Sequence, residues 1–186
     1  MRLFIAIQIS EEIRGALESF LAQMHAIAPQ AKWVRAANLH VTLKFLGNTD
    51  AQKLPQIQNA LRSVRSSQPV TLEFRGLGFF PNEKRPRVFW AGMQSSTNVP
   101  ELAAAIDHAM HQLDFPLEER PFTPHLTLAR FDPPGLPPKL SAVVKQHALK
   151  NFGSLSTREF HLIESKLKST GAEYTTVQSF AFVAEP

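Results

Sequence analysis

The sequence predicts a fold of the α+β class, with antiparallel sheets and helices that do not alternate regularly with the strands. Three observations lead to this class. Segments with helical and strand periodicity are interspersed, several strand segments are close enough in sequence to pair as hairpins, and no glycine-rich phosphate loop follows the first strand. The lack of that loop argues against a doubly wound nucleotide-binding fold.

The first quarter of the chain predicts a strand, a helix and two further strands. Residues 2–9 are rich in β-forming residues, and Ser10 is a favourable N-cap for a helix over residues 11–28, where apolar residues recur at helical spacing. Strands are predicted at residues 32–34 and 39–46. Gly47 and Asn48 are typical turn residues, so we expect the second of these strands to end there.

The rest of the chain continues the mixture of helices and strands. Apolar residues three and four positions apart indicate helices at residues 54–64, 99–113 and 139–150. β-Branched and aromatic residues indicate strands at residues 70–80, 87–93, 125–130, 157–168 and 174–183. The last two are expected to pair as a hairpin over residues 169–171. We find no linker or low-complexity tract, and therefore expect a single domain over residues 1–186.

Composition excludes several classes of protein. The 186 residues include no cysteine, which rules out disulfides, thiolate catalysis and thiolate metal sites and makes a cytoplasmic location the expectation. No apolar run approaches the ~18 residues of a membrane span, and acidic residues follow the first apolar stretch where a signal peptide would be cleaved. A net charge of +4 favours an anionic partner only weakly.

One phrase occurs twice. His40-Val41-Thr42-Leu43 and His125-Leu126-Thr127-Leu128 share the pattern His-apolar-Thr-Leu, 85 positions apart, and both lie in predicted strands. Because side chains alternate between the faces of a strand, each copy places its histidine and threonine on one face and its apolar residues on the other. If the two halves of the chain build similar lobes, the two strands can face each other across a groove.

Such a set of side chains fits acid–base chemistry on a phosphate. A neutral imidazole can take a proton from a nucleophile while an imidazolium gives one to a leaving oxygen, both near neutral pH. Threonine hydroxyls can donate hydrogen bonds to anionic oxygens as charge grows in the transition state. Hydrolysis of a cyclic phosphodiester needs these groups and no metal. Metal binding by the two histidines is disfavoured because no Asp, Glu or Cys accompanies either copy at ligand spacing.

These residues carry a family resemblance. LHVTLKFLG (39–47) and RPFTPHLTLAR (120–130) resemble the two signature motifs of the two-histidine phosphoesterase superfamily. The opening RLFIAI, the segment PRVFWAGM (86–93) and the C-terminal strand pair resemble the RNA 2′,3′-cyclic phosphodiesterases, also called 2′-5′ RNA ligase-like proteins, within it. The resemblance covers nearly the whole chain.

The resemblance implies a bilobal α+β fold with pseudo-two-fold symmetry, in which two antiparallel sheets face a central cleft and helices lie outside. It implies hydrolysis of 2′,3′-cyclic phosphate ends of RNA or nucleotides to 2′-phosphates, together with weak reversible 2′-5′ ligation in some members. His40 and His125 would be catalytic, with His40 as the acid for the leaving 3′-oxygen and His125 as the base for water. Thr42 and Thr127 would bind the phosphate.

The resemblance also bears on cofactors and partners. No metal or nucleotide cofactor is implied. The expected partners are RNA ends or cyclic nucleotides that bear a 2′,3′-cyclic phosphate, tRNA fragments among them. We expect no membrane association, and we expect a monomer.

Three further residues near the motifs are candidates. By resemblance Arg130 contacts the phosphate or nucleotide, although it lies five positions after His125 and would point away from the groove in a regular strand. Lys44 lies four positions after His40 and has the parity to face the groove, but a solvated charge at the strand end explains it equally well. Phe4 could stack on a base of a bound nucleotide or belong to the core.

Other features keep two interpretations. A basic cluster could attract an RNA backbone or simply form a solvated rim, and it comprises Arg75, Lys84, Arg85 and Arg87. His108 and His111 are spaced to share a metal on a helix, but surface histidines are the simpler explanation. Function also has alternatives: a nucleotide- or RNA-binding module without turnover, or a phosphodiesterase for 2′-5′-linked oligonucleotides or another small cyclic phosphate.

Overall fold

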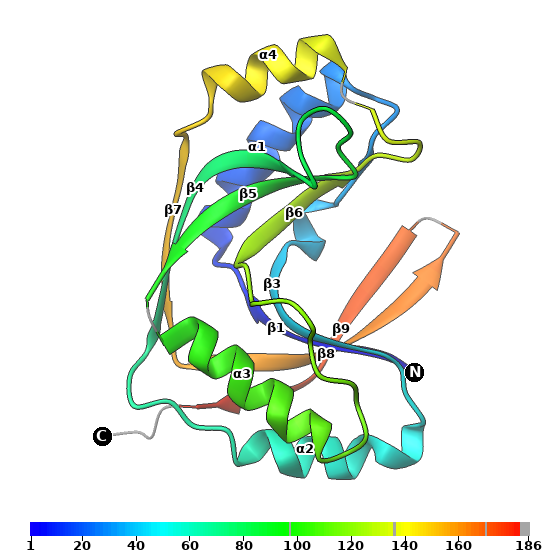
Figure 1. Ribbon diagram of the computed structural model, residues 1–186, viewed down its shortest axis with the longest axis vertical. Coiled ribbons are helices and arrows are strands. Elements are labelled where there is room, and N and C mark those ends of the chain that lie inside the picture. The colour runs from blue at the N-terminus through cyan, green and yellow to red at the C-terminus, as the bar shows by residue number, and fades with distance from the viewer. Residues whose placement is uncertain (97, 136, 170, 183–186) are drawn as a thin grey trace.

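Two antiparallel sheets form the centre of the computed structural model, which describes residues 1–96, 98–135, 137–169 and 171–182 (Figure 1). The four-stranded sheet contains, in order, β3 (His40–Asn48), β1 (Arg2–Gln8), β8 (Glu159–Lys168) and β9 (Gly171–Ala181). The five-stranded sheet contains β2 (Lys32–Trp33), β6 (His125–Arg130), β5 (Val88–Ser95), β4 (Val70–Phe80) and β7 (Asn151–Thr157). The predicted α+β class with two antiparallel sheets is confirmed.

The helices pack on the sheets in pairs. Helices α1 (Glu11–Ile27) and α4 (Pro138–Gln146) cover the five-stranded sheet, and α2 (Leu54–Arg62) and α3 (Asn98–His111) cover the four-stranded sheet (Figure 1). Two short 3-10 helices, η1 (Ala36–Asn38) and η2 (Ala51–Lys53), precede β3 and α2. Among the described residues, none of these helices is long and apolar enough to cross a bilayer.

Local sequence accounts for where the first two α-helices begin. The Ser10 hydroxyl accepts a hydrogen bond from the Ile13 amide at 3.3 Å and so caps α1, as the sequence predicts. Helix α2 carries Pro55 in its first turn, where the missing amide hydrogen has no partner to lose. One face of α1 is buried, along Ile13, Leu17, Phe20, Leu21 and Met24.

Each lobe is assembled from both halves of the chain. After β1 the chain crosses from the four-stranded sheet to place α1 on the five-stranded one, and near its end it crosses back from β7 to β8. The expectation that each half of the chain builds one lobe is therefore wrong. A single cluster of buried apolar residues runs through both lobes, from β1 and α1 to β4, α3 and β6. The two sheets thus fold around a shared core, which fixes the position of one relative to the other.

The sequence did not predict strand β7. Its residues NFGSLST contain a glycine and two serines, which are weak strand formers, yet they pair along β4 from Val70↔Thr157 to Arg75↔Asn151. Gly153 adopts a φ of +116°, and its Cα faces Ile13 of α1 so closely that a Cβ would lie 3.1 Å from that side chain. Tertiary pairing therefore outweighs the local preference.

Strand β3 does not end at Gly47. It runs to Asn48 and pairs with β1 throughout, with Arg2 opposite Asn48. Gly47 adopts a φ of +69° within the strand, at a register shift next to Leu3. The expected turn is thus a β-bulge. The other differences are shifts of a few residues at element ends, and residues 170 and 183, placed in the last hairpin, lie outside the described residues.

Candidate active site

The repeated phrase begins β3 in one sheet and β6 in the other. His40 lies opposite Gln8 of β1, and Thr42 lies two residues further along the same face. His125 lies opposite Gly92 of β5, and Thr127 follows it in the same way. In both copies the histidine and threonine are partly exposed while the residues between and after them are buried. The alternation expected from the sequence holds over these four positions.

One cavity brings the two copies together. It has a volume of about 520 Å³ and is lined by His40, Thr42, His125 and Thr127, from opposite sheets. Its walls also include Tyr174 of β9, which the sequence analysis did not single out. The structure thus places two imidazoles and two hydroxyls on a single solvent-accessible space of a size that holds small ligands.

The two imidazoles are held in the same way. Nδ1 of His40 lies 2.7 Å from the carbonyl oxygen of Asn38, and Nδ1 of His125 lies 2.8 Å from that of Thr123. Because a carbonyl oxygen can only accept, each Nδ1 must carry the hydrogen and donate it. Nε2 is therefore the nitrogen that gains and loses a proton in both histidines.

Asn38 is itself fixed, which helps to orient His40. Its side-chain amide donates a hydrogen bond to the carbonyl of Ala172 in β9 at 2.7 Å. This contact ties η1 to the β8–β9 hairpin. The carbonyl that orients His40 is thereby linked to the far edge of the same sheet.

The environments of the two histidines differ. The His40 ring packs against Phe4 and Tyr174, with ring centroids 4.6 Å and 5.2 Å away, whereas His125 meets the edge of Phe80 at 5.1 Å. Burial lowers the pKa of His40, and the hydrogen bond to Asn38 opposes this only in part. In the protein without a ligand, His40 therefore favours the neutral imidazole.

Phe4 is covered. Its side chain is 3% exposed, and its ring packs against those of His40 and Tyr174, the latter 5.0 Å away. This exposure leaves almost no ring face for a nucleobase, although Phe4 does contribute to the cavity wall. Its main contact with the site is through His40, whose ring it supports.

A β-bulge follows the threonine in both strands. Along β1, Ala6 is opposite Thr42 but Ile5 is opposite Lys44, which leaves Leu43 as an extra residue. Along β5, Trp90 is opposite Thr127 but Phe89 is opposite Ala129, which leaves Leu128 as an extra residue. A bulge shifts the alternation by one residue. The two strands therefore repeat each other beyond the four-residue phrase.

The bulges determine where the next side chains point. Arg130, five positions after its histidine, is exposed and lines the same cavity as His125 and Thr127. In a regular strand its odd offset from His125 would turn it away from the groove, but the extra residue Leu128 brings it back to the same face. Phe45 holds the matching position in β3, where it is 60% exposed and lines the cavity as well. In a regular strand Phe45 would point away from the groove, so the sequence does not predict its place in the cavity wall.

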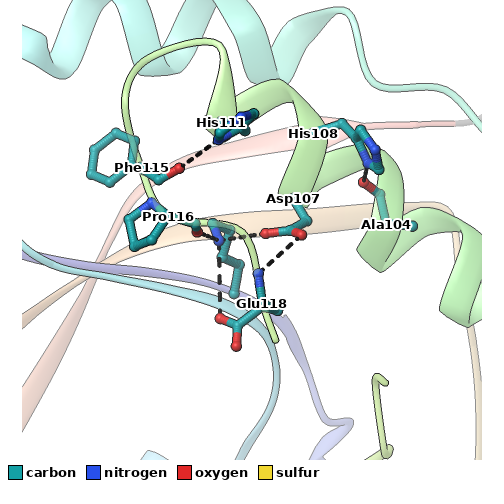
Figure 2. Close-up of polar contacts among 8 residues, drawn as sticks. Ala104, Asp107, His108, His111, Phe115, Pro116 and Glu118 are labelled. Carbon is teal, nitrogen blue, oxygen red and sulfur yellow. Dashed lines mark hydrogen bonds and ion pairs between the residues drawn. The ribbon is translucent and has the colours of Figure 1, made fainter. Parts of the chain in front are cut away.

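Lys44 does not line the cavity of the two histidine strands. Its side chain is 1% exposed, and its Nζ donates to the Asp107 carboxylate of α3 and, at 2.8 Å, to the carbonyl of Pro116 (Figure 2). Glu118 lies 3.9 Å away, and its backbone amide donates to the other Asp107 oxygen at 3.2 Å. Both earlier interpretations of Lys44 are wrong, because the bulge turns it into the core. It anchors α3 and the loop after it to β3.

His108 and His111 have different hydrogen-bond partners. Nδ1 of His108 lies 2.8 Å from the Ala104 carbonyl, and that of His111 lies 3.2 Å from the Phe115 carbonyl (Figure 2). In the described part of the chain, no three His, Asp or Glu side chains gather in a group that could hold a metal ion. Of the basic cluster, Arg75 pairs with Glu73 at 2.9 Å.

Comparison with known proteins identifies the family. The family model described as LigT-like phosphoesterase matches residues 7–90 and 93–174, and both histidine strands lie within these ranges. The chain belongs to this family. The resemblance seen in the sequence motifs is thereby confirmed.

Relatives in the family match the chain over nearly its full length. The RNA 2′,3′-cyclic phosphodiesterase of Archaeoglobus fulgidus is 32% identical over 180 residues, which are 97% of this chain and 99% of that protein. A crystal structure of a Thermus thermophilus protein superposes with a TM-score of 0.82 at 30% identity and covers 100% of both chains. The structure of Escherichia coli LigT complexed with 3′-AMP gives a TM-score of 0.76 at 29% identity, with 98% of both chains covered.

Proposed function

We propose that this protein hydrolyses the 2′,3′-cyclic phosphate ends of RNA or nucleotides to 2′-phosphates, without a metal ion. The observation that carries the proposal is the cavity lined by two imidazoles and two threonine hydroxyls from opposite sheets. The names of the relatives support it, and so does the 3′-AMP complex of the LigT structure. The histidines and threonines supply an acid, a base and hydrogen-bond donors, which is the set that this reaction needs.

In the proposed mechanism a water molecule attacks the phosphorus of the cyclic ester. The water gives a proton to Nε2 of His125, its oxygen bonds to phosphorus, and the bond from phosphorus to the 3′-oxygen breaks. Nε2 of His40 gives its proton to that leaving oxygen. Thr42, Thr127 and Arg130 donate hydrogen bonds to the non-bridging oxygens as their charge grows. A 5′-hydroxyl in place of water would give a 2′-5′ linkage, so weak ligation, for example of tRNA fragments, follows from the same groups.

Ligand binding must change the charge of His40 if it is the acid. Burial favours the neutral form in the free protein, whereas an anionic phosphate beside the ring stabilises the imidazolium. Binding of the substrate would then be coupled to protonation of His40. The protein takes up a proton at His40 when it binds the phosphodiester near neutral pH.

We expect the pKa of His40 to rise when a 2′-nucleotide binds. In the free protein the imidazole should titrate below the ordinary histidine value, because burial disfavours its charge. In the complex the midpoint should lie higher, and between the two midpoints binding takes up protons. Titration of the histidine ring signals by NMR, with and without 2′-AMP, measures both. An equal or lower midpoint in the complex would remove His40 from the role of acid.

Turnover of 2′,3′-cyclic AMP in excess chelator tests the function itself. We expect hydrolysis to persist when EDTA is present and the product to be 2′-AMP rather than 3′-AMP. Activity that disappears with the chelator and returns with a divalent cation would contradict metal independence. Binding without any product on long incubation would instead indicate a binding module, and cleavage of 2′-5′-linked oligonucleotides alone would indicate the other alternative substrate.

A further inference from the structure

A second and larger cavity opens beside the candidate active site. It has a volume of about 920 Å³ and shares Thr42, Phe45 and His125 with the smaller one. Its other walls come from β3, the end of β4, β5 and α3, from the loop that joins β4 to β5, and from the segment between α3 and β6. Phe45 therefore lies where the two cavities meet, so a ligand bound at the two histidines can extend into this space.

The walls of the larger cavity are aromatic and apolar. Phe45, Phe80 and Phe122 line it together with Pro100 and Pro121. The ring of Phe80 is less available to a ligand, because it packs against Trp90 at 5.3 Å and His125 at 5.1 Å. Phe45, at 60% exposure, presents the most accessible ring. Aromatic surfaces of this kind bind nucleobases with little dependence on sequence.

The rim of the larger cavity is basic. Arg87 and Arg120 line it, and within the described ranges neither guanidinium has a carboxylate within ion-pair distance. Two acidic residues also line it. Asp107 is neutralised by Lys44, and Glu118 lies 3.9 Å from the same amine. The remaining charge at the rim is therefore positive.

The basic rim continues onto the protein surface. Arg87 also lines a third cavity of about 390 Å³, together with Lys84 and Arg85 in the loop between β4 and β5. These are three of the four residues of the basic cluster in the sequence. Positively charged side chains thus extend from the larger cavity onto the surface along the β4–β5 loop.

We propose that the larger cavity binds the RNA chain on the 5′ side of the 2′,3′-cyclic phosphate, with a base against Phe45 or Phe122 and phosphates at Arg87 and Arg120. The inference rests on the proposed function. It makes an oligonucleotide end, rather than a free cyclic nucleotide, the preferred substrate. Aromatic walls with a basic rim are the combination by which proteins bind single strands.

The test compares two substrates, 2′,3′-cyclic AMP and a tetranucleotide that ends in a 2′,3′-cyclic phosphate. We expect a higher kcat/KM for the tetranucleotide. In Arg120→Ala and Arg87→Ala the ratio of the two kcat/KM values should fall roughly tenfold, the effect of losing one charged hydrogen bond. Arg62→Ala, which removes an exposed arginine of α2 that lines none of these cavities, should keep the ratio.

The salt dependence of kcat/KM is a second test of the contacts between these arginines and the phosphates. The kcat/KM for the tetranucleotide should fall more steeply with salt than that for the mononucleotide, and Arg120→Ala should reduce the difference. Turnover of both substrates with an unchanged ratio in the two cavity variants overturns the inference and leaves the proposed function standing. Turnover of neither substrate by the unaltered protein overturns both.

Discussion

Replacement of Asp107 by alanine is expected to lower the free energy of unfolding by about 3–5 kcal/mol, the usual effect of removing one partner of a buried ion pair. The Lys44 ammonium would remain 1% exposed without its carboxylate, because the Pro116 carbonyl and the more distant Glu118 replace only part of the interaction. The loop after α3 would also lose the bond from the Glu118 amide. Urea unfolding followed by circular dichroism measures the change.

An exposed ion pair is the matched control for this experiment. Glu11 pairs with Arg14 at 3.1 Å, but the glutamate side chain is 89% exposed, so Glu11→Ala should cost less than about 1 kcal/mol. Asp107→Asn keeps the shape and should fall between the two. If Asp107→Ala costs no more than Glu11→Ala, Lys44 does not depend on Asp107 in the way the structure indicates.

The sequence predicted the parts of the fold that local pattern controls. Alternation and helical spacing located most elements, and the repeated phrase located the four side chains that the structure brings into one cavity. Each histidine could be grouped with its own threonine from sequence, because residues two apart in a strand lie on the same face. How the lobes divide the chain was not predictable, since α1 crosses to the other sheet through tertiary packing.

The errors around the site have one physical cause. A regular strand places Lys44 toward the groove and Arg130 away from it, and the extra residues Leu43 and Leu128 reverse both assignments. Nothing in the local sequence specifies a bulge, because it arises from pairing with a neighbouring strand. The same shift brings Phe45 to the cavity, whereas Phe4, for which the sequence left base stacking and the core open, is buried.

Removal of either histidine of the proposed acid–base pair is expected to have the largest effect on activity. His40→Ala and His125→Ala should each lower kcat for 2′,3′-cyclic AMP by about 10²–10⁴-fold, the range for loss of a general acid or base. Circular dichroism and the thermal midpoint should show a folded protein in both cases. His40→Gln and His125→Gln are the companion variants, since they fill more of the space that His40 shares with Phe4 and Tyr174. If the alanine or the glutamine variants unfold only above the assay temperature, their loss of kcat can be assigned to the missing histidine and not to unfolding.

In the proposed mechanism the two histidine strands act together on one phosphate, and a double-mutant cycle in kcat tests this most directly. If acid and base serve the same step, the variant that lacks both histidines should lose little more activity than the worse single variant, because groups that act as a unit are not additive. We expect that result. Losses that multiply, or undiminished turnover in either single variant, would contradict a shared site built from β3 and β6.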